Sequence, residues 1–363
     1  MTKQLKYLFL TLVILNCNLV FSQKSKNFLE INSFYGIAIE HDKSLHTAIQ
    51  GNPFGFIISY NIKNTKEKEF LKYYNYPDFG FSALYENTNS SILGEMFGAY
   101  THYNFYLNNR NIKNRLSLRI AFGLAYITKP YDANSNPYNF ALASKIAGSA
   151  YVKFNYQRFF WQKKIGLQTG ISLIHFSNAG MKNPNLGLNT FAVNLGINYN
   201  FDSEEFHFGK TEKNPKITSK LHYDFIFRTG KNESKNIGSG SYPFYVATFK
   251  INKKINYKST LTTGIDYFDS KFLKNYIDED TPQPQITNTK RIGIFVGHDL
   301  NIHKINAITQ IGYHVYYPKK YVSRLYERVG FNHFINKHIF AELTLKINLF
   351  RAEMLEFGLG FRL

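Results

Sequence analysis

The chain has 363 residues, of which 44% are hydrophobic and 17% aromatic, and its formal net charge is +19. A mean hydropathy of −0.30 excludes a helical membrane protein. Lys and Arg are scattered between aromatic residues, whereas a nucleic-acid-binding protein concentrates them in a patch. We therefore expect a basic surface facing anionic lipid headgroups and no nucleic-acid partner.

Residues 1–22 have the pattern of a secretory signal peptide. A short basic stretch precedes an apolar core, and small and polar residues follow up to Ser22. Cys17 is the only cysteine and lies inside this segment, after an Asn16 that fits a lipoprotein cleavage site poorly. We expect an exported mature chain that has neither a disulfide nor a thiol nucleophile.

Most of the remaining chain alternates apolar and polar residues with a period of two. In residues 116–126, apolar side chains occupy every even position, and small or polar ones occupy every odd position. Successive side chains of a strand point to opposite faces, so each such segment predicts a strand with one apolar face. We count about sixteen such segments, within a range of roughly 12–16, each long enough to cross a bilayer when tilted.

This alternation is also found in soluble β-sandwiches. The export signal, the aromatic content and the alternation up to Leu363 favour an outer-membrane protein instead. The predicted fold class is all-β, a transmembrane antiparallel β-barrel, because a closed barrel satisfies every backbone group inside a membrane.

The sequence NLGINYNF, at the end of residues 189–201, resembles the last strand of a barrel placed in mid-chain. It divides the chain beyond the signal peptide into residues 23–202 and residues 203–363, the second part adding further strands. One large barrel and two small ones both fit this pattern. We expect one barrel, because closing a single sheet leaves no strand edge exposed.

Polar residues interrupt the apolar face of one strand at its end. The odd-numbered residues from Ile165 to Leu173 are mostly apolar, and they lead to His175 and Ser177; in the next strand, Asn189 lies on the apolar face. The alternation predicts that these three polar side chains face lipid. Both ends of such barrels usually lie in the periplasm, so this seventh strand runs outward and its end lies beside the outer leaflet.

The segment 175–187 resembles the outer-membrane lipid A 3-O-deacylases and their acyloxyacyl hydrolase-like relatives. The shared pattern is His-x-Ser-Asn followed by Pro-Asn and Gly, here His175, Ser177, Asn178, Pro184, Asn185 and Gly187. The resemblance extends over about residues 27–201, and the remainder is similar to the C-terminal extension of longer relatives.

This resemblance implies a serine esterase that removes an ester-linked acyl chain from the lipid A of lipopolysaccharide, in the outer membrane of a Gram-negative bacterium. Ser177 would be the nucleophile and His175 the general base. Backbone N–H groups near Asn178 and Gly180 would hold the oxyanion, and Asn185 would order the loop. Lipopolysaccharide and outer-membrane lipids are the implied partners, no cofactor or metal is implied, and a homodimer is left open.

Asn189 departs from the family pattern, which has an acidic residue at this position to orient the histidine. An amide can orient an imidazole, but it cannot stabilise an imidazolium as a carboxylate does. Loss of the acid from a serine triad costs up to about 10⁴ in rate. Asp132, in the preceding loop, is a second candidate for the carboxylate.

Three other interpretations remain open. In the first two, the barrel is a porin-like channel or a structural protein that has lost its chemistry. His175 and Ser177 would then be ordinary polar residues where a strand leaves the membrane. An outer-membrane phospholipase is the third, because acyl groups contribute only non-directional burial. The other histidines have no metal-ligand spacing, so we expect no metal.

Overall fold

The structure is a computed structural model, and it describes residues 26–65, 69–201, 207–209, 212, 215, 217, 219–274, 288–318, 321–349 and 351–363. The expected signal peptide, residues 1–22, lies outside these residues. The described residues form sixteen strands and three short helical segments, α2 (Glu69–Tyr73), η1 (Lys43–Leu45) and η2 (Lys271–Lys274). Within the described part of the chain, no helix is long and apolar enough to span a membrane.

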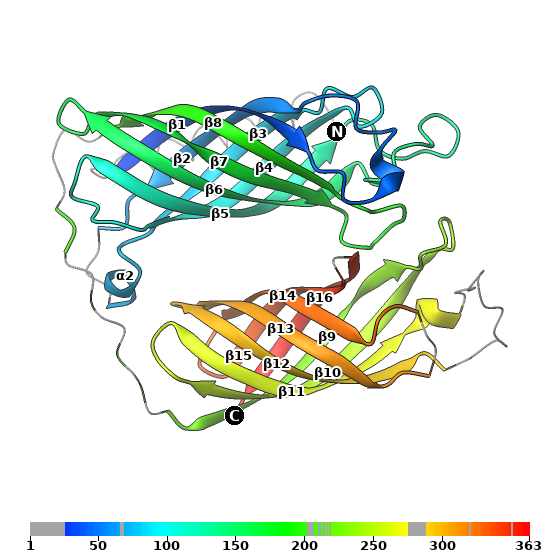
Figure 1. Ribbon diagram of the computed structural model, residues 1–363. Helices are drawn as coiled ribbons and strands as arrows, with labels where there is room; N and C mark the ends of the chain where they lie inside the picture. Colours follow the sequence, from blue (N-terminus) through cyan, green and yellow to red (C-terminus); the bar gives the residue numbers. More distant parts are fainter. Residues whose placement is uncertain are drawn as a thin grey trace, which may run out of the picture.

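The strands close into two barrels of eight strands each (Figure 1). The first barrel consists of β1 (Asn27–Ala38), β2 (Phe54–Ile62), β3 (Asp78–Asn87), β4 (Glu95–Tyr106), β5 (Asn114–Ile127), β6 (Ile146–Phe160), β7 (Ile165–Ser177) and β8 (Leu188–Asn200). The second consists of β9 (Leu221–Glu233), β10 (Ser241–Lys254), β11 (Ser259–Ser270), β12 (Lys290–Ile302), β13 (Ile305–Tyr316), β14 (Leu325–Phe334), β15 (Ile339–Asn348) and β16 (Arg351–Arg362).

Each barrel is closed by pairing between its first and last strands. In the first barrel β1 pairs with β8, from Phe28 opposite Asn200 to Ala38 opposite Thr190. In the second, β16 pairs with β9. The all-β barrel class is thus confirmed, but the expectation of a single barrel was wrong. A sheet that closes after eight strands also leaves no edge, so the argument from exposed edges could not distinguish the two arrangements.

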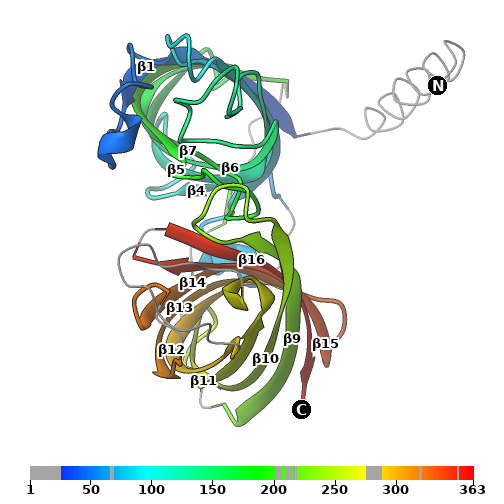
Figure 2. The same cartoon turned by 90° about the vertical axis from the view of Figure 1, so that its right-hand side faces the viewer.

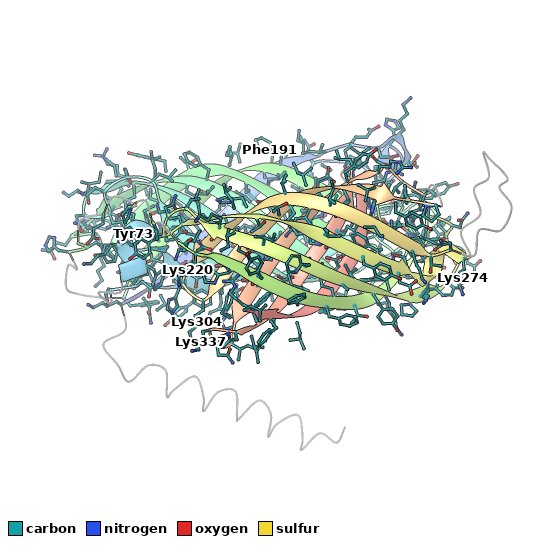
Figure 3. All side chains as sticks on the ribbon, turned by 90° about the horizontal axis from the view of Figure 1, so that it is seen from below. Tyr73, Phe191, Lys220, Lys274, Lys304 and Lys337 are labelled. Carbon is teal, nitrogen blue, oxygen red and sulfur yellow. The ribbon has the colours of Figure 1, made fainter. Side chains whose placement is uncertain are left out.

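The outer surfaces of both barrels are apolar, and their interiors are polar. In β7, Leu167, Ile171 and Leu173 are exposed, whereas Gln168 and Ser172 between them are buried. Such alternation, apolar outward and polar inward, is typical of outer-membrane barrels. In Figure 3, side chains project from both barrels; exposed lysines lie at the strand ends of the second barrel, where lipid headgroups are expected: Lys220, Lys304, Lys337 and Lys274.

Ion pairs cross both interiors. In the first barrel, buried Arg119 of β5 pairs with buried Glu30 of β1, and these strands stand on opposite sides of the ring of eight. In the second, Arg291 of β12 pairs with Glu353 of β16 at 2.6 Å, again across the ring. Buried charges require partners, and here the partners come from the opposite wall. Side chains therefore bridge the lumen of each barrel. Figure 2 shows the barrels as rings of strands.

The two barrels lie side by side and touch near both ends (Figures 1 and 2). At the end where β7 begins, the Tyr74 hydroxyl donates a hydrogen bond to the carbonyl of Asn301 at 2.6 Å. Between the ends, the Phe122 and Phe331 rings meet edge to face. At the end where β7 finishes, the β7–β8 loop packs on the outer ends of β9 and β16. This last contact lies at the candidate site.

Candidate active site

Strand register brings the predicted polar residues to the outer face of the first barrel. His175 of β7 stands directly opposite Asn189 of β8, and Ser177 ends β7 opposite Gly148 of β6. Their neighbours Ile174 and Phe176 are fully buried inside the barrel. Alternation then requires His175 and Ser177 to point outward, as the sequence predicts. The half-buried His175 and the 8% exposed Ser177 are covered by the β7–β8 loop rather than by the lumen.

His175, Asn189 and His41 form a hydrogen-bonded row along this face. The Nε2 atom of His41 lies 3.0 Å from the carbonyl of Leu186, closer than its Nδ1 lies to Ile39 O at 3.2 Å, so we place the His41 proton on Nε2. The Asn189 amide nitrogen then donates to His41 Nδ1 at 3.3 Å. This turns Oδ1 of Asn189 toward Nδ1 of His175, 2.7 Å away.

That row fixes the tautomer of His175. An amide oxygen only accepts, so His175 Nδ1 carries the proton and its Nε2 keeps a free lone pair. A general base needs this arrangement. Asn189 thus supplies orientation, the part of an acid's role that an amide can perform.

Sequence analysis did not identify His41. It follows β1, and it reaches Asn189 because β1 pairs with β8; the backbone N–H of Ile39 donates to the carbonyl of Asn189 at 2.8 Å. In a single barrel of sixteen strands, β1 would have paired with the last strand instead. Only the closure of eight strands brings His41 to the site.

Ser177 is held by the loop that follows it. The Asn185 side-chain amide donates to the Ser177 hydroxyl oxygen at 3.0 Å, and its carbonyl oxygen accepts from the backbone N–H of Asn178 at 2.9 Å. The backbone N–H of Ala179 also donates to the Ser177 oxygen at 3.1 Å. In this conformation, no hydrogen bond within the described residues joins Ser177 to His175. Ser177 and His175 are two residues apart and lie on the same face of β7. Catalytic hydrogen bonds often tighten only when substrate binds.

Gly187 allows the β7–β8 loop to pass close to the imidazole of His175. Its φ of +79° lies in the left-handed region, and a Cβ added there would approach Cε1 of His175 to 3.1 Å. A residue with a side chain would therefore be strained and would also press on the base. Gly180, at φ +76°, faces the carbonyls of Ala352 and Glu353 in the second barrel.

Asp132 does not join the site. Its carboxylate accepts hydrogen bonds from the backbone N–H groups of Asn134 and Ser135 in its own turn. The N–H of Ser135 is the main reason that the pKa of Asp132 lies below its usual value. No contact in the described residues joins this carboxylate to His175, so Asn189 is the residue that orients the imidazole.

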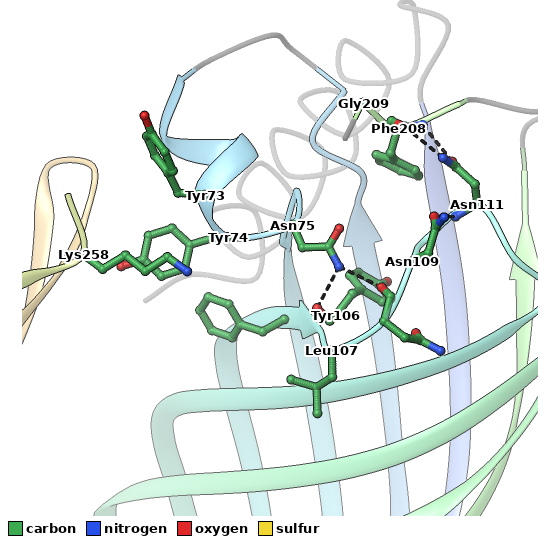
Figure 4. Close-up of a pocket in the computed structure, with 12 residues that line it drawn as sticks. Tyr73, Tyr74, Asn75, Tyr106, Leu107, Asn109, Asn111, Phe208, Gly209 and Lys258 are labelled. Atoms are coloured by element: carbon green, nitrogen blue, oxygen red, sulfur yellow. Dashed lines mark hydrogen bonds between the residues drawn. The ribbon is translucent and has the colours of Figure 1, made fainter. Parts of the chain in front are cut away.

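A cavity of about 260 Å³ opens beside Asn185, between the two barrels. Its walls come from the β7–β8 loop, from Asp42, Ser44 and Phe140 of the first barrel, and from residues of the second barrel that include Glu233 and Lys235. A larger cavity of about 720 Å³ lies at the opposite end (Figure 4), and none of its described lining residues is a serine, a histidine or a carboxylate. Among the described residues, no group of three His, Cys, Asp or Glu side chains could hold a metal ion.

Comparison with protein families gives a separate match for each barrel. Residues 54–198 match the model of the family described as lipid A 3-O-deacylase (PagL). Residues 221–363 match the acyloxyacyl hydrolase C-terminal domain, so the second barrel has a family model of its own. The first barrel thus resembles the lipid A 3-O-deacylases, and the second resembles the C-terminal domain of the acyloxyacyl hydrolases. The chain is an outer-membrane β-barrel protein, and its C-terminal extension is the second barrel.

Solved structures give weaker likenesses. The crystal structure of the outer-membrane enzyme PagL is 13% identical, with a TM-score of 0.34, and covers 46% of this chain and 97% of its own. The outer-membrane protein opdK from Pseudomonas aeruginosa is 9% identical, with a TM-score of 0.22, covering 93% of this chain and 98% of its own. A mutant of the TodX monoaromatic hydrocarbon channel is 8% identical, with a TM-score of 0.18, covering 95% and 90%. A comparison with curated proteins found no match.

Proposed function

We propose that this protein is a serine esterase that removes an ester-linked acyl chain from the lipid A of lipopolysaccharide. The observation that carries the proposal is the row His41–Asn189–His175 beside Ser177, on the lipid-facing surface at the outer end of β7. A polar cluster on that surface is costly in a bilayer unless its reactant is a lipid.

In the proposed reaction, the Ser177 oxygen attacks the ester carbonyl carbon while His175 Nε2 takes the hydroxyl proton. The tetrahedral intermediate collapses, the carbon–oxygen bond to the sugar breaks, and the protonated imidazole returns the proton to the leaving alkoxide. A water molecule, deprotonated by His175, then hydrolyses the acyl-serine and releases the fatty acid.

The loop would stabilise the negative charge on the carbonyl oxygen. The backbone N–H groups of Ala179 and Gly180 follow Ser177 closely in this loop and are the proposed donors. The Ala179 N–H already donates to the Ser177 oxygen, whereas the Asn178 N–H donates to Asn185. Loss of one such donor typically costs about 10²–10³ in rate. Asn185 orders this segment, because its amide holds both Ser177 and the Asn178 N–H.

Purified protein mixed with lipopolysaccharide provides the test, with the released fatty acids identified by mass spectrometry. We expect one fatty acid to appear with the wild type and none above background with Ser177→Ala. Ser172→Ala is the matched control, because Ser172 lies on the same strand but points into the lumen. Equal release by wild type and Ser177→Ala would refute the role of Ser177. Release from glycerophospholipids alone would assign a phospholipase instead.

A further inference from the structure

A group of hydrogen bonds between the barrels falls on the loop that holds Ser177. The backbone N–H of Asn183 donates to the Oε2 atom of Glu233 at 2.6 Å, and the Asn183 side chain donates to the carbonyl of Ser234, also at 2.6 Å. The backbone N–H of Glu233 donates in turn to the carbonyl of Gly180 at 3.3 Å. Glu233 thus makes two hydrogen bonds to the loop, one through its carboxylate and one through its backbone N–H.

Glu233 is itself fixed. It is 7% exposed at the end of β9, and its second carboxylate oxygen accepts the backbone N–H of Gly240 at 3.3 Å, across the β9–β10 turn. A hydrogen bond to an ionised acceptor is about twice as strong as one between neutral groups. The carboxylate therefore connects a rigid strand of the second barrel to the loop of the first.

These contacts lie close to the residue that holds Ser177. Asn183 stands two positions before Asn185, whose amide holds the Ser177 oxygen. Across the same loop, the Asn178 side chain donates to the carbonyl of Lys182 at 2.7 Å. His175 and Asn189, by contrast, are placed by strands of the first barrel alone. The first barrel thus positions His175, the proposed base, and the second barrel supports the loop that holds Ser177, the proposed nucleophile.

We propose that the C-terminal barrel completes the active site, with Glu233 as a positioning residue that holds the Ser177 loop in its reactive conformation. This inference rests on the proposed esterase function, and it assigns the second barrel a role in catalysis. Misplacement of a reacting group by about 1 Å can cost 10²-fold in rate, so a loop clamp of this kind acts on kcat.

The test compares three full-length variants. Glu233→Ala removes the acceptor, and we expect kcat to fall by about 10- to 100-fold with KM changed by less than about twofold. Glu233→Gln keeps an acceptor oxygen and should retain most of the activity. Tyr74→Phe is the control, because it breaks a hydrogen bond between the barrels at their opposite end, to the carbonyl of Asn301 at 2.6 Å. It should leave kcat near the wild-type value.

Amide hydrogen exchange of residues 178–187 is the second readout, and it does not depend on any enzymatic activity. Exchange should rise in Glu233→Ala and stay unchanged in Tyr74→Phe. Unchanged exchange and kcat in Glu233→Ala would overturn the inference, as would equal losses in Tyr74→Phe. If Ser177→Ala and the wild type were equally inactive while the exchange result held, the esterase proposal would fail and the loop clamp would stand.

Discussion

Asn189 is the residue whose chemistry limits this site most. Its amide orients His175 and selects the tautomer with a free Nε2, but it carries no charge to stabilise the imidazolium that the proposed reaction would form on His175. The row of neutral groups continues to His41, whose Nδ1 accepts from the same amide. Asn189 and His41 therefore both help to orient the imidazole of His175, and neither supplies a negative charge.

Replacing Asn189 with Asp should accelerate the reaction. The carboxylate would keep the contact with Nδ1 of His175 and add charge stabilisation, so we expect kcat to rise by about tenfold or more. His41→Ala alone should lower kcat, because nothing then holds the Asn189 amide in its orientation. The same substitution should cost less beside Asn189→Asp, since both carboxylate oxygens accept. Steady-state kinetics of the four proteins measures this coupling, and strict additivity would contradict it.

At the scale of elements, the β7–β8 hairpin shows what sequence reasoning can and cannot find. Alternation within a strand is local, so it predicted correctly that His175, Ser177 and Asn189 share the outer face. The pairing of β1 with β8 is non-local and depends on how many strands close the ring, which alternation does not encode. His41 was missed for that reason, and so were the contacts of Glu233 with the loop.

Gly187 provides the prediction at this scale. Gly187→Ala would place a methyl group 3.1 Å from Cε1 of His175 and strain a backbone at φ +79°. We expect a clear loss of kcat from displacement of the imidazole. Gly238→Ala is matched for strain, at φ +78°, but its Cβ would have nothing within 4 Å. Both should lose about 1–2 kcal/mol of stability, measured by urea unfolding, and only the first should lose activity. Equal activity of the two variants would count against the close packing of loop and base.

At the scale of the whole molecule, two filled barrels stand where one wide barrel was expected. Eight strands leave an interior just wide enough for side chains, and here ion pairs between opposite strands occupy it. A passive channel needs an open path, whereas buried ion pairs cross the lumens of both barrels. We therefore infer that the polar interiors stabilise the barrels, while the proposed reaction takes place on the outer surface of the first barrel.

Conductance tests this view of the lumens. Purified protein inserted in planar bilayers should give no steady ion current at any holding voltage. A porin of known conductance, reconstituted in the same way, controls for insertion. Stable unitary currents from the wild type would revive the porin-like interpretation, and their loss on blocking one barrel would show which lumen conducts.

Mass spectrometry of lipid A from Gram-negative cells tests the central claim most directly. Cells expressing the wild-type protein should contain lipid A that has lost the mass of one acyl chain. Cells expressing Ser177→Ala at the same level in the outer membrane should keep all of their acyl chains. Fully acylated lipid A with the wild type and with Asn189→Asp alike, or deacylation that persists in Ser177→Ala, would contradict the account.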